Sequence, residues 1–371
     1  MLSFKFRMYP SKTIHAKLNE HLELCRWLYN RLLGELNTAK VEGRKITQLE
    51  TQAMIVRLKE EKLDLKDVYS KVLQMVNYQL WSNVRALAQL KRNGRRVGKL
   101  RFKGSWFKTL NYNQSGFKLM GKKLVLSKVG EIPIKLHREV RGEIKGIVVK
   151  RERSGKWYAV LQVEDKSEPL PKTGKAIGID VGIKHFLSDT EGRQIENPKF
   201  YENSLERIKA RYRQLSKKEK GSKNREKART KLARAYERLV NQRDDFLHKL
   251  SRFYVDNYDV IAAEDLNIAG MVRNHNIAQK ILDVSWGKFL RFMSYKAGRA
   301  GRTVVRVDPR RTSKEFKHGE IDKDYNAALN ILERGLVGLG WPELTPVEME
   351  PLRKLTRVSA SSVVEAGSPL R

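Results

Sequence analysis

The spacing of apolar residues predicts a helical stretch near the start of the chain. Residues 1–9 alternate apolar and polar side chains, which is typical of a strand. Apolar residues then recur at helical spacing as far as Gly34, which we interpret as a stop signal. A second helix is expected after Thr47, and a third carries an apolar stripe that ends before Gly94. Residues 10–99 are therefore predicted to form a helical domain whose apolar stripes pack in a core.

The pattern changes to short alternating runs between residues 100 and 168. Turn signals containing glycine separate several of these runs, which predicts a small antiparallel β-barrel. The strand over residues 1–9 is expected to complete this barrel, because an N-terminal strand can join a sheet that forms later in the chain.

A third pattern begins at Gly174 and mixes strands with helices. The sequence GKAIGIDVGIKHFLSDTEG predicts two strands joined by a tight turn, and the charged residues 202–256 predict a helical hairpin. The elements expected after it are a strand over 260–263, a helix over 285–298, a strand over 303–307 and a helix over 324–334 that stops at Gly335. Residues 346–371, rich in Ser, Pro and Glu, are expected to form a mobile tail.

Charge indicates the class of partner. The 371 residues include 76 Lys and Arg against 42 Asp and Glu, which gives a net charge of +34. Such a surplus favours a nucleic-acid partner, with an anionic membrane surface as the alternative. The sequence contains no apolar span of about 20 residues and no secretory leader, so we expect a cytoplasmic protein that associates with the nucleoid and not with membranes. The single cysteine, Cys25, excludes an internal disulfide framework and any zinc site that needs two cysteines.

A basic segment without acids joins the helical stretch to the barrel. Its cations are Lys91, Arg92, Arg95, Arg96, Lys99, Arg101 and Lys103. The aromatic residues Phe102, Trp106 and Tyr112 lie within it or just after it. Cations neutralise phosphates and aromatic rings stack on bases, so we interpret these cations, Trp106 and Tyr112 as a nucleic-acid-binding segment. Barrel packing is the alternative for Phe102 and Trp106. The cations of the 202–256 hairpin are interpreted as contacts to RNA or to a heteroduplex, with a solvated helix face as the alternative.

Three acids occupy positions that suit a metal site. Asp180 interrupts an apolar strand, Glu264 ends another, and Asp324 opens the last helix. Carboxylates from separate elements can hold two Mg²⁺ ions around a scissile phosphate. Each acid also has an ordinary alternative: a lysine partner for Asp180, a strand-end charge for Glu264, and a favourable interaction with the helix dipole for Asp324. Spacing alone does not bring the three together.

An ordered set of motifs identifies a family. The stretches are FKFRMYPSK, CRWLYNRLL, RFKGSWFKTLNY, GIDVGIKHFLSDTEG, IAAEDLNIAGM, SWGKFLRFMSYKAGRAGRTVVRVDPRRTS and DKDYNAALNIL. In this order they resemble the TnpB (OrfB) family of transposon-encoded RNA-guided nucleases, which are related to type V CRISPR effectors. The resemblance covers nearly the whole chain.

The resemblance implies a multidomain α+β fold. An RNase H-like RuvC nuclease domain is expected over 169–345, a wedge-like β-barrel over 1–9 and 100–168, and an inserted helical recognition domain over 10–99. Asp180, Glu264 and Asp324 are the implied catalytic carboxylates. Asp324 is preferred over Asp322 because it directly precedes the Tyr-Asn-Ala-Ala run, and the resemblance to the wider superfamily implies that this is the catalytic position.

The resemblance also implies partners and an activity. The partners are a noncoding guide RNA and double-stranded target DNA that carries a short adjacent motif, with sequence read mainly by base pairing. The implied activity is Mg²⁺-dependent cutting of the target DNA.

One departure from the family pattern bears on activity. Family members usually carry a four-cysteine zinc ribbon before the final Asp motif, whereas residues 312–324 contain no cysteine. No zinc is therefore expected, and His318 alone is interpreted as a surface residue. The alternative function is an RNA-guided DNA-binding protein that cleaves weakly or not at all. A basic nucleic-acid chaperone without a guide is disfavoured by the three intact acids.

Overall fold

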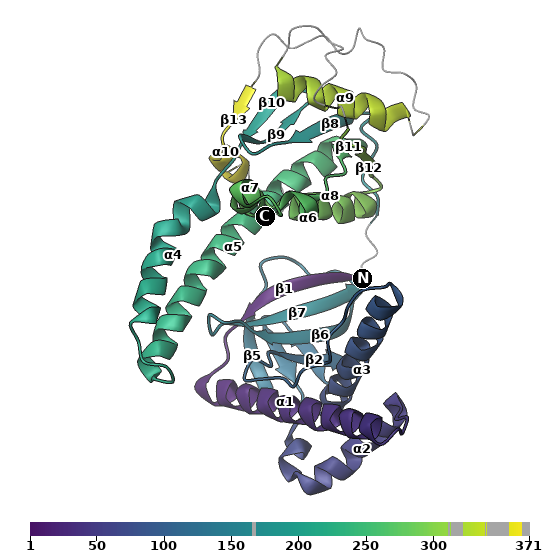
Figure 1. Ribbon diagram of the computed structural model, residues 1–371, viewed down its shortest axis with the longest axis vertical. Coiled ribbons are helices and arrows are strands. Elements are labelled where there is room, and N and C mark those ends of the chain that lie inside the picture. Colours follow the sequence, from purple (N-terminus) through teal and green to yellow (C-terminus); the bar gives the residue numbers. More distant parts are fainter. Residues whose placement is uncertain (165–167, 311, 313–321, 338, 340–355, 366–371) are drawn as a thin grey trace. The chain divides into compact units, whose positions relative to one another are not determined.

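The computed structural model describes residues 1–164, 168–310, 312, 322–337, 339 and 356–365. The chain divides into two compact units, Met1–Lys166 and Ser167–Arg371 (Figure 1). Each unit combines helices with its own sheet, in agreement with the predicted multidomain α+β class. No helix within the described ranges is long and apolar enough to cross a bilayer.

The first unit is built on a seven-stranded antiparallel sheet. Its strands are β1 (Leu2–Met8), β2 (Thr109–Asn113), β3 (Phe117–Met120), β4 (Lys123–Leu126), β5 (Gly130–Lys135), β6 (Glu143–Arg151) and β7 (Trp157–Glu164), in the order β2-β6-β7-β1-β5-β4-β3. The N-terminal strand lies between β7 and β5, as the sequence predicted. Within residues 1–164 no ladder pairs β2 with β3, so the predicted barrel is only partly closed.

Three helices and one short 3₁₀ turn accompany this sheet, and two of the helices contact it directly. They are α1 (Lys12–Val41), α2 (Gln48–Glu61), η1 (Leu63–Asp67) and α3 (Ser70–Arg92). Helix α2 begins with a capping box between Thr47 and Glu50, which explains why it starts where the sequence predicted. The prediction that α1 stops at Gly34 is wrong. One interior glycine costs only about 1 kcal/mol, and the buried residues on either side of it, Leu33 and Ala39, offset that cost.

Helices and sheet of this unit share one core. Leu28 of α1 and Val76 of α3 belong to the same buried cluster as Ile147 of β6 and Leu161 of β7. The helical segment 10–99 therefore lies in the same compact unit as the sheet and contributes to the same core.

The second unit contains a six-stranded mixed sheet. Its strands are β8 (Ala176–Val181), β9 (His185–Asp189), β10 (Arg193–Glu196), β11 (Val260–Glu264), β12 (Thr303–Val307) and β13 (Thr356–Val358), in the order β12-β11-β8-β9-β10-β13. β8, β9 and β10 are antiparallel neighbours, whereas β11 and β12 run parallel to β8. β11 is buried over its whole length, which explains its unbroken apolar run.

Helices cover both faces of this sheet. They are α4 (Phe200–Ser216), α5 (Lys223–Asn257), α6 (Ile268–Met271), α7 (His275–Val284), α8 (Trp286–Ala300), α9 (Lys323–Val337) and α10 (Ala360–Glu365). Ile177 and Ile179 of β8 pack with Phe246 of α5 and Phe289 of α8 on one face, and α9 lies on the other (Figure 1). The predicted hairpin is confirmed: α4 and α5 pack along each other through Ile208, Leu232 and Leu239.

Two expectations for the end of the chain need correction. α9 continues through Gly335 to Val337, because Gly335 lies against β11, where an added Cβ would stand 2.7 Å from that of Ala262. Close packing, and not helix termination, therefore explains this glycine. Residues 356–358 of the expected tail form β13, which pairs in parallel with β10, and 360–365 form α10.

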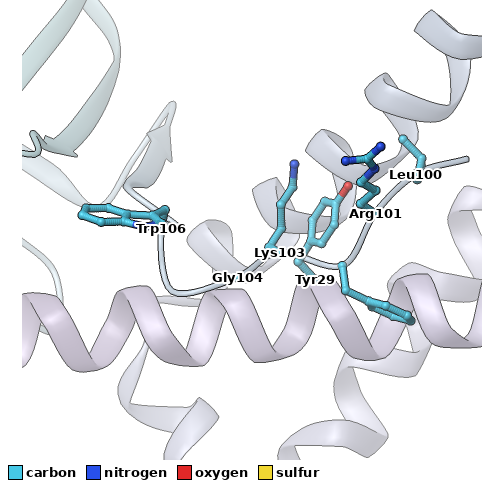
Figure 2. A pocket seen from close by; sticks show the side chains of 7 residues that line it. Tyr29, Leu100, Arg101, Lys103, Gly104 and Trp106 are labelled. Atoms are coloured by element: carbon cyan, nitrogen blue, oxygen red, sulfur yellow. The ribbon is translucent and has the colours of Figure 1, made fainter. Parts of the chain in front are cut away.

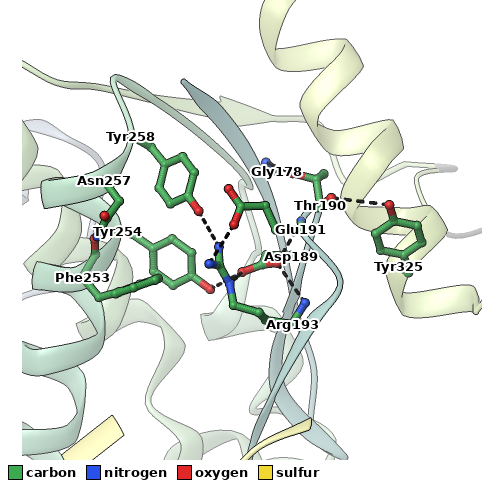
Figure 3. Close-up of polar contacts among 10 residues, drawn as sticks. All are labelled: Gly178, Asp189, Thr190, Glu191, Arg193, Phe253, Tyr254, Asn257, Tyr258 and Tyr325. Carbon is green, nitrogen blue, oxygen red and sulfur yellow. Dashed lines mark hydrogen bonds and ion pairs between the residues drawn. The ribbon is translucent and has the colours of Figure 1, made fainter. Parts of the chain in front are cut away.

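A buried ion pair fastens the turn between β9 and β10 to the end of α5 (Figure 3). The Asp189 carboxylate, fully buried, accepts hydrogen bonds from Arg193 Nε at 2.7 Å and from the Tyr254 hydroxyl at 2.7 Å. Arg193 also donates to the Tyr258 hydroxyl. On the other side of the turn, Tyr325 of α9 donates its hydroxyl to the Thr190 carbonyl oxygen at 3.4 Å. The Tyr325 bond links the N-terminal turn of α9 to the turn between β9 and β10.

Candidate functional site

Asp180 and Glu264 lie side by side at the carboxyl ends of two neighbouring parallel strands. Ala263 of β11 pairs with Ile179 of β8, so the next residue of each strand is one of the two acids. Side chains alternate along a strand, and both acids fall on the face that α9 covers. On that face Ala262 packs with Ile331, while Gly178 faces the Ala328 carbonyl oxygen.

The direction of α9 brings Asp324 to the same end of the sheet. Leu332 and Leu336, in the last turns of the helix, pack on Val260 at the start of β11. The helix therefore runs antiparallel to β8 and β11, and its first turn lies at their carboxyl ends. Asp324 is one turn before Ala328, which touches β8 two residues before Asp180.

Electrostatics agree with this convergence. Burial raises the pKa of Asp180 to about 8, and the negative charges of Glu264 and Asp324 add to that shift. Burial also raises the pKa of Glu264, while a hydrogen bond from Thr312 and the positive charge of Arg334 oppose the shift. Acids that repel one another in a buried place indicate a site suited to a cation.

The structure distinguishes Asp324 from Asp322. The Asp322 carboxylate accepts hydrogen bonds from the backbone N–H groups of Asp324 at 3.0 Å and Tyr325 at 3.1 Å, and it caps α9. Gln194 also donates to it at 3.3 Å. Asp322 is therefore engaged in starting the helix, whereas Asp324 contributes to the field at Asp180.

The three carboxylates fit Mg²⁺ by chemistry but do not form a closed cage. Within the described residues no three His, Cys, Asp or Glu side chains stand in a ready ligand geometry. Mg²⁺ commonly keeps several waters and takes only one or two carboxylates, so an incomplete protein ligand set is compatible with it. A bound cation would favour the charged form of Asp180 and so offset the effect of burial and of the neighbouring negative charges.

Sequence reasoning missed one residue of this site, Thr312. Its hydroxyl donates to Glu264 Oε1, and its side chain is buried. Thr312, which follows β12 in the sequence, therefore contacts the last residue of the neighbouring strand β11. The motif PRRTS was a possible signal, but nothing in its spacing indicates a contact with Glu264.

The basic segment lies in the first unit and is open to solvent. Lys91 and Arg92 form the last turn of α3, and Arg95, Arg96, Lys99 and Arg101 are exposed after it. Lys103 is half-buried, with its Nζ atom 5.0 Å from the ring centre of Tyr29. Residues 91–103 contain no Asp or Glu, so these cations have no acidic partner within the segment itself.

An open cavity of about 260 Å³ follows this segment along α1 (Figure 2). Tyr29, Arg101, Lys103 and Trp106 line it together with Leu100, Phe102 and Gly104. Asn30 fixes the loop: its Nδ2 donates to the Lys103 carbonyl oxygen at 2.9 Å, and its Oδ1 accepts from the Lys103 N–H at 2.6 Å.

One of the two aromatic predictions, that for Tyr112, needs correction. Tyr112 is only 1% exposed and stacks on Tyr69 at 6.1 Å between ring centres, so its ring cannot reach a base. Its inward position follows from the alternation of β2. Phe102 and Trp106 are 60% and 43% exposed, which excludes the alternative that they belong to the core. Lys108 Nζ and the Arg153 guanidinium lie 5.3 and 5.4 Å from the Trp106 ring, so this ring is flanked by cations.

Two further expectations lie outside the described residues. They are the surface position of His318 and the absence of a zinc ribbon between residues 313 and 321.

Three family models match parts of the chain. "Probable transposase" (OrfB of IS605) matches residues 158–275, "Helix-turn-helix domain" of the same family matches 1–45, and "Cas12f1-like, TNB domain" matches 286–319. The first match contains Asp180 and Glu264. Residues 1–45 include only one described helix, α1, which continues without a turn from Lys12 to Val41.

Two bacterial proteins are similar over almost the whole chain. A protein of Streptomyces pristinaespiralis named "Putative RNA-guided DNA endonuclease" is 30% identical over 97% of this chain and 95% of its own length. An Escherichia coli K12 protein with the same description, InsQ, is 26% identical over 94% of this chain and 97% of its own length.

Similarity also extends to Cas12f1. The Sulfoacidibacillus thermotolerans protein named CRISPR-associated endodeoxyribonuclease Cas12f1 is 24% identical over half of each chain. A solved structure titled "Cryo-EM structure of the Cas12f1-sgRNA-target DNA complex" superposes with a TM-score of 0.54, 15% identity, and coverage of 86% of this chain and 83% of that one. At this identity the superposition establishes a shared fold. The chain therefore belongs to the TnpB (OrfB) family of transposon-encoded proteins and is related to Cas12f1.

Proposed function

We propose that the protein is an RNA-guided DNA endonuclease that cuts target DNA beside a short adjacent motif. The observation that carries the proposal is the convergence of Asp180, Glu264 and Asp324 from two strands and one helix at one end of the sheet. The similarity to two bacterial proteins named as RNA-guided DNA endonucleases supports the same activity. The mixed sheet with α9 on one face supports an RNase H-like, RuvC-type nuclease over residues 169–345.

The three carboxylates would hold Mg²⁺, with two ions expected for a phosphodiester substrate. Bound there, the ions would supply an activated water and charge stabilisation at the leaving oxygen. Asp180 and Glu264 sit on adjacent rigid strands, so their relative position is fixed by backbone pairing. Asp324 approaches from the helix, and Asp322 fixes the start of that helix through its capping bonds. Asp180 must lose its proton to act as a ligand, which couples metal binding to proton release.

The nucleic-acid contacts are proposed for the basic segment and the loop after it. Lys91, Arg92, Arg95, Arg96, Lys99, Arg101 and Lys103 would neutralise phosphates of a guide RNA or its DNA target. Trp106 offers an exposed ring beside Lys108 and Arg153, an arrangement that supports stacking on a base. Tyr112 is not proposed. The buried Tyr29 ring instead supports the loop through its contact with Lys103.

Cleavage of motif-flanked DNA by the purified protein, loaded with its co-expressed RNA and Mg²⁺, tests the proposal. Asp180→Ala, Glu264→Ala and Asp324→Ala are each expected to reduce the cleavage rate by at least about 100-fold while RNA binding persists. Glu196→Ala, an exposed acid at the end of β10, is the matched control and is expected to cut normally. Cutting that persists in Asp180→Ala would refute the metal-site assignment.

The second candidate is an RNA-guided DNA-binding protein with weak or no cleavage. The observation that favours it is the cysteine content: with Cys25 alone, and that residue buried in the first unit, the chain has no four-cysteine zinc ribbon. Target binding without cutting, measured on the same DNA with Mg²⁺ present, would select this candidate. Absence of a discrete co-purified RNA would reject both guided functions and favour a general nucleic-acid chaperone.

A further inference from the structure

Glu264 receives a hydrogen bond from a residue that follows a different strand. After β12 ends at Val307, the chain reaches Thr312, whose buried hydroxyl donates to Glu264 Oε1. The same hydroxyl lies 3.0 Å from the Pro309 carbonyl oxygen. One hydroxyl hydrogen cannot serve two acceptors fully, and a carboxylate is the stronger acceptor, so the bond to Glu264 dominates.

Helix α9 holds Thr312 in place from the other side. Asn330 Nδ2 donates to the Thr312 carbonyl oxygen at 2.8 Å, and both residues are almost fully buried. One turn later, Arg334 donates to the Arg310 carbonyl oxygen at 2.6 Å. The Asn330 amide and the Thr312 hydroxyl thus form a chain of two hydrogen bonds from α9 to Glu264.

This arrangement makes one helix responsible for two of the three acids. Its first turn carries Asp324, and its middle fixes Thr312, which orients Glu264. We propose that Thr312 is a positioning residue for Glu264 and that Asn330 holds Thr312, so that α9 sets the position of the Glu264 carboxylate as well as that of Asp324. The inference rests on the proposed function for its metal ligand, but the position of Glu264 itself does not depend on that function.

The variants Thr312→Ser and Thr312→Ala isolate the hydroxyl. Both lack the methyl group of threonine, and only the first keeps the donor, so loss of packing affects the two in similar measure. Thr303→Ala, an exposed threonine of β12, repeats the substitution away from the site and serves as the control. Two readouts are needed on the full chain: Mn²⁺ affinity by electron paramagnetic resonance without nucleic acid, and the metal-free crystal structure.

Thr312→Ala is expected to weaken Mn²⁺ binding by about 10- to 100-fold, the usual effect of removing a partner of a metal ligand. Thr312→Ser is expected to keep most of the wild-type Mn²⁺ affinity. In the crystal structures the Glu264 carboxylate should keep its wild-type orientation in the serine variant and adopt a different orientation in the alanine variant. Asn330→Ala should displace Thr312 and give an effect of the same sign.

Two results would overturn the inference. One is an unchanged Glu264 orientation in Thr312→Ala, and the other is equal weakening of Mn²⁺ binding by the alanine and serine variants. If the wild-type protein binds no Mn²⁺ and cuts no DNA, the proposed function fails instead. The orientation of Glu264 in the metal-free crystals still decides the positioning role in that case.

Discussion

Asp180 faces opposite requirements for folding and for chemistry. Its pKa in the folded protein is raised to about 8, from 3.8 for an ordinary aspartate, by burial and by the charges of Glu264 and Asp324. A group with a raised folded pKa contributes stability below its unfolded pKa and loses that contribution as pH rises through the folded pKa. The metal-free protein should therefore lose stability between about pH 4 and about pH 8.

Asp180→Asn removes this titration and is expected to be more stable than wild type at pH 8 without metal. The thermal midpoint should rise by more than about 2–4 °C, which is the shift that 1 kcal/mol of unfolding free energy produces in a unit of this size. Thermal unfolding in chelator at pH 5 and pH 8 measures it, with Glu196→Gln as control. A midpoint that falls equally at both pH values would contradict the prediction.

His21 is a second buried group whose protonation is expected to lower the stability of the folded protein. Burial and the nearby charge of Lys17 lower its pKa to about 4. Among the described residues, neither ring nitrogen has a hydrogen-bond partner. A lowered folded pKa means that stability present above pH 6.5 is lost as pH falls towards 4.

His21→Leu should therefore raise the thermal midpoint and flatten its decline between pH 6.5 and pH 4. The expected gain is about 1–3 kcal/mol, the usual cost of a buried polar group without a partner. Calorimetry across this pH range measures the effect, and the exposed His275→Leu is the matched control. Equal acid sensitivity in His21→Leu and wild type would show that another group governs it.

At the scale of elements, the contact of α9 with β8 decides the geometry of the site. A Cβ atom added at Gly178 would stand 2.2 Å from the Ala328 backbone carbonyl oxygen, and the backbone cannot yield as a side chain can. Gly178→Ala should push α9 from the sheet and move Asp324 relative to Asp180.

We expect Gly178→Ala to cost about 1–3 kcal/mol of unfolding free energy through overpacking, and to slow cleavage at least tenfold. Denaturant unfolding and cleavage kinetics measure the two effects. Gly298→Ala in α8 has open space around the added Cβ and should be neutral or slightly stabilising. A normal cleavage rate in Gly178→Ala would mean that the position of α9 does not govern the site.

Asn30 of α1 fixes the backbone of the loop after α3. It makes two hydrogen bonds to the backbone of Lys103, in addition to the contact of the Tyr29 ring with the Lys103 side chain. Asn30→Ala should weaken RNA binding by about 3- to 10-fold, the loss expected for two modest hydrogen bonds, without changing the salt dependence, because no charge is removed. Filter binding at several salt concentrations measures both, with the exposed Asn276→Ala as control. A reduced salt slope in Asn30→Ala would contradict the anchoring role.

At the scale of the whole molecule, the net charge of +34 should appear as a steep salt dependence. Replacing Arg95, Arg96, Lys99 and Arg101 by Gln should reduce the slope of log K against log salt by about 0.7 for each single-strand phosphate that is no longer neutralised. The same charge change at the exposed residues Lys40, Lys45, Arg57 and Lys66 is the control. Equal slopes for the two quadruple variants would indicate that binding depends on total charge and not on this segment.

Most elements were predictable because each rests on a local pattern. The alternation in β1, the apolar run of β11 and the Thr47 capping box all act between near neighbours in sequence. Glycine was the weak point, since Gly34 and Gly335 both lie inside helices. A glycine signals either a stop or a close approach, and only the neighbouring elements decide which.

The sequence by itself predicted most of the elements, a polyanionic class of partner and the three candidate acids, because spacing, charge and strand ends are local properties. The tertiary structure alone decided which side chains meet. It buried Tyr112, exposed Trp106, turned Asp322 into a helix cap and brought Thr312 to Glu264. These contacts join residues far apart in the chain, and they depend on the register of β8 with β11 and on the direction of α9. Neither the strand register nor the helix direction can be predicted from the spacing of residues within one segment.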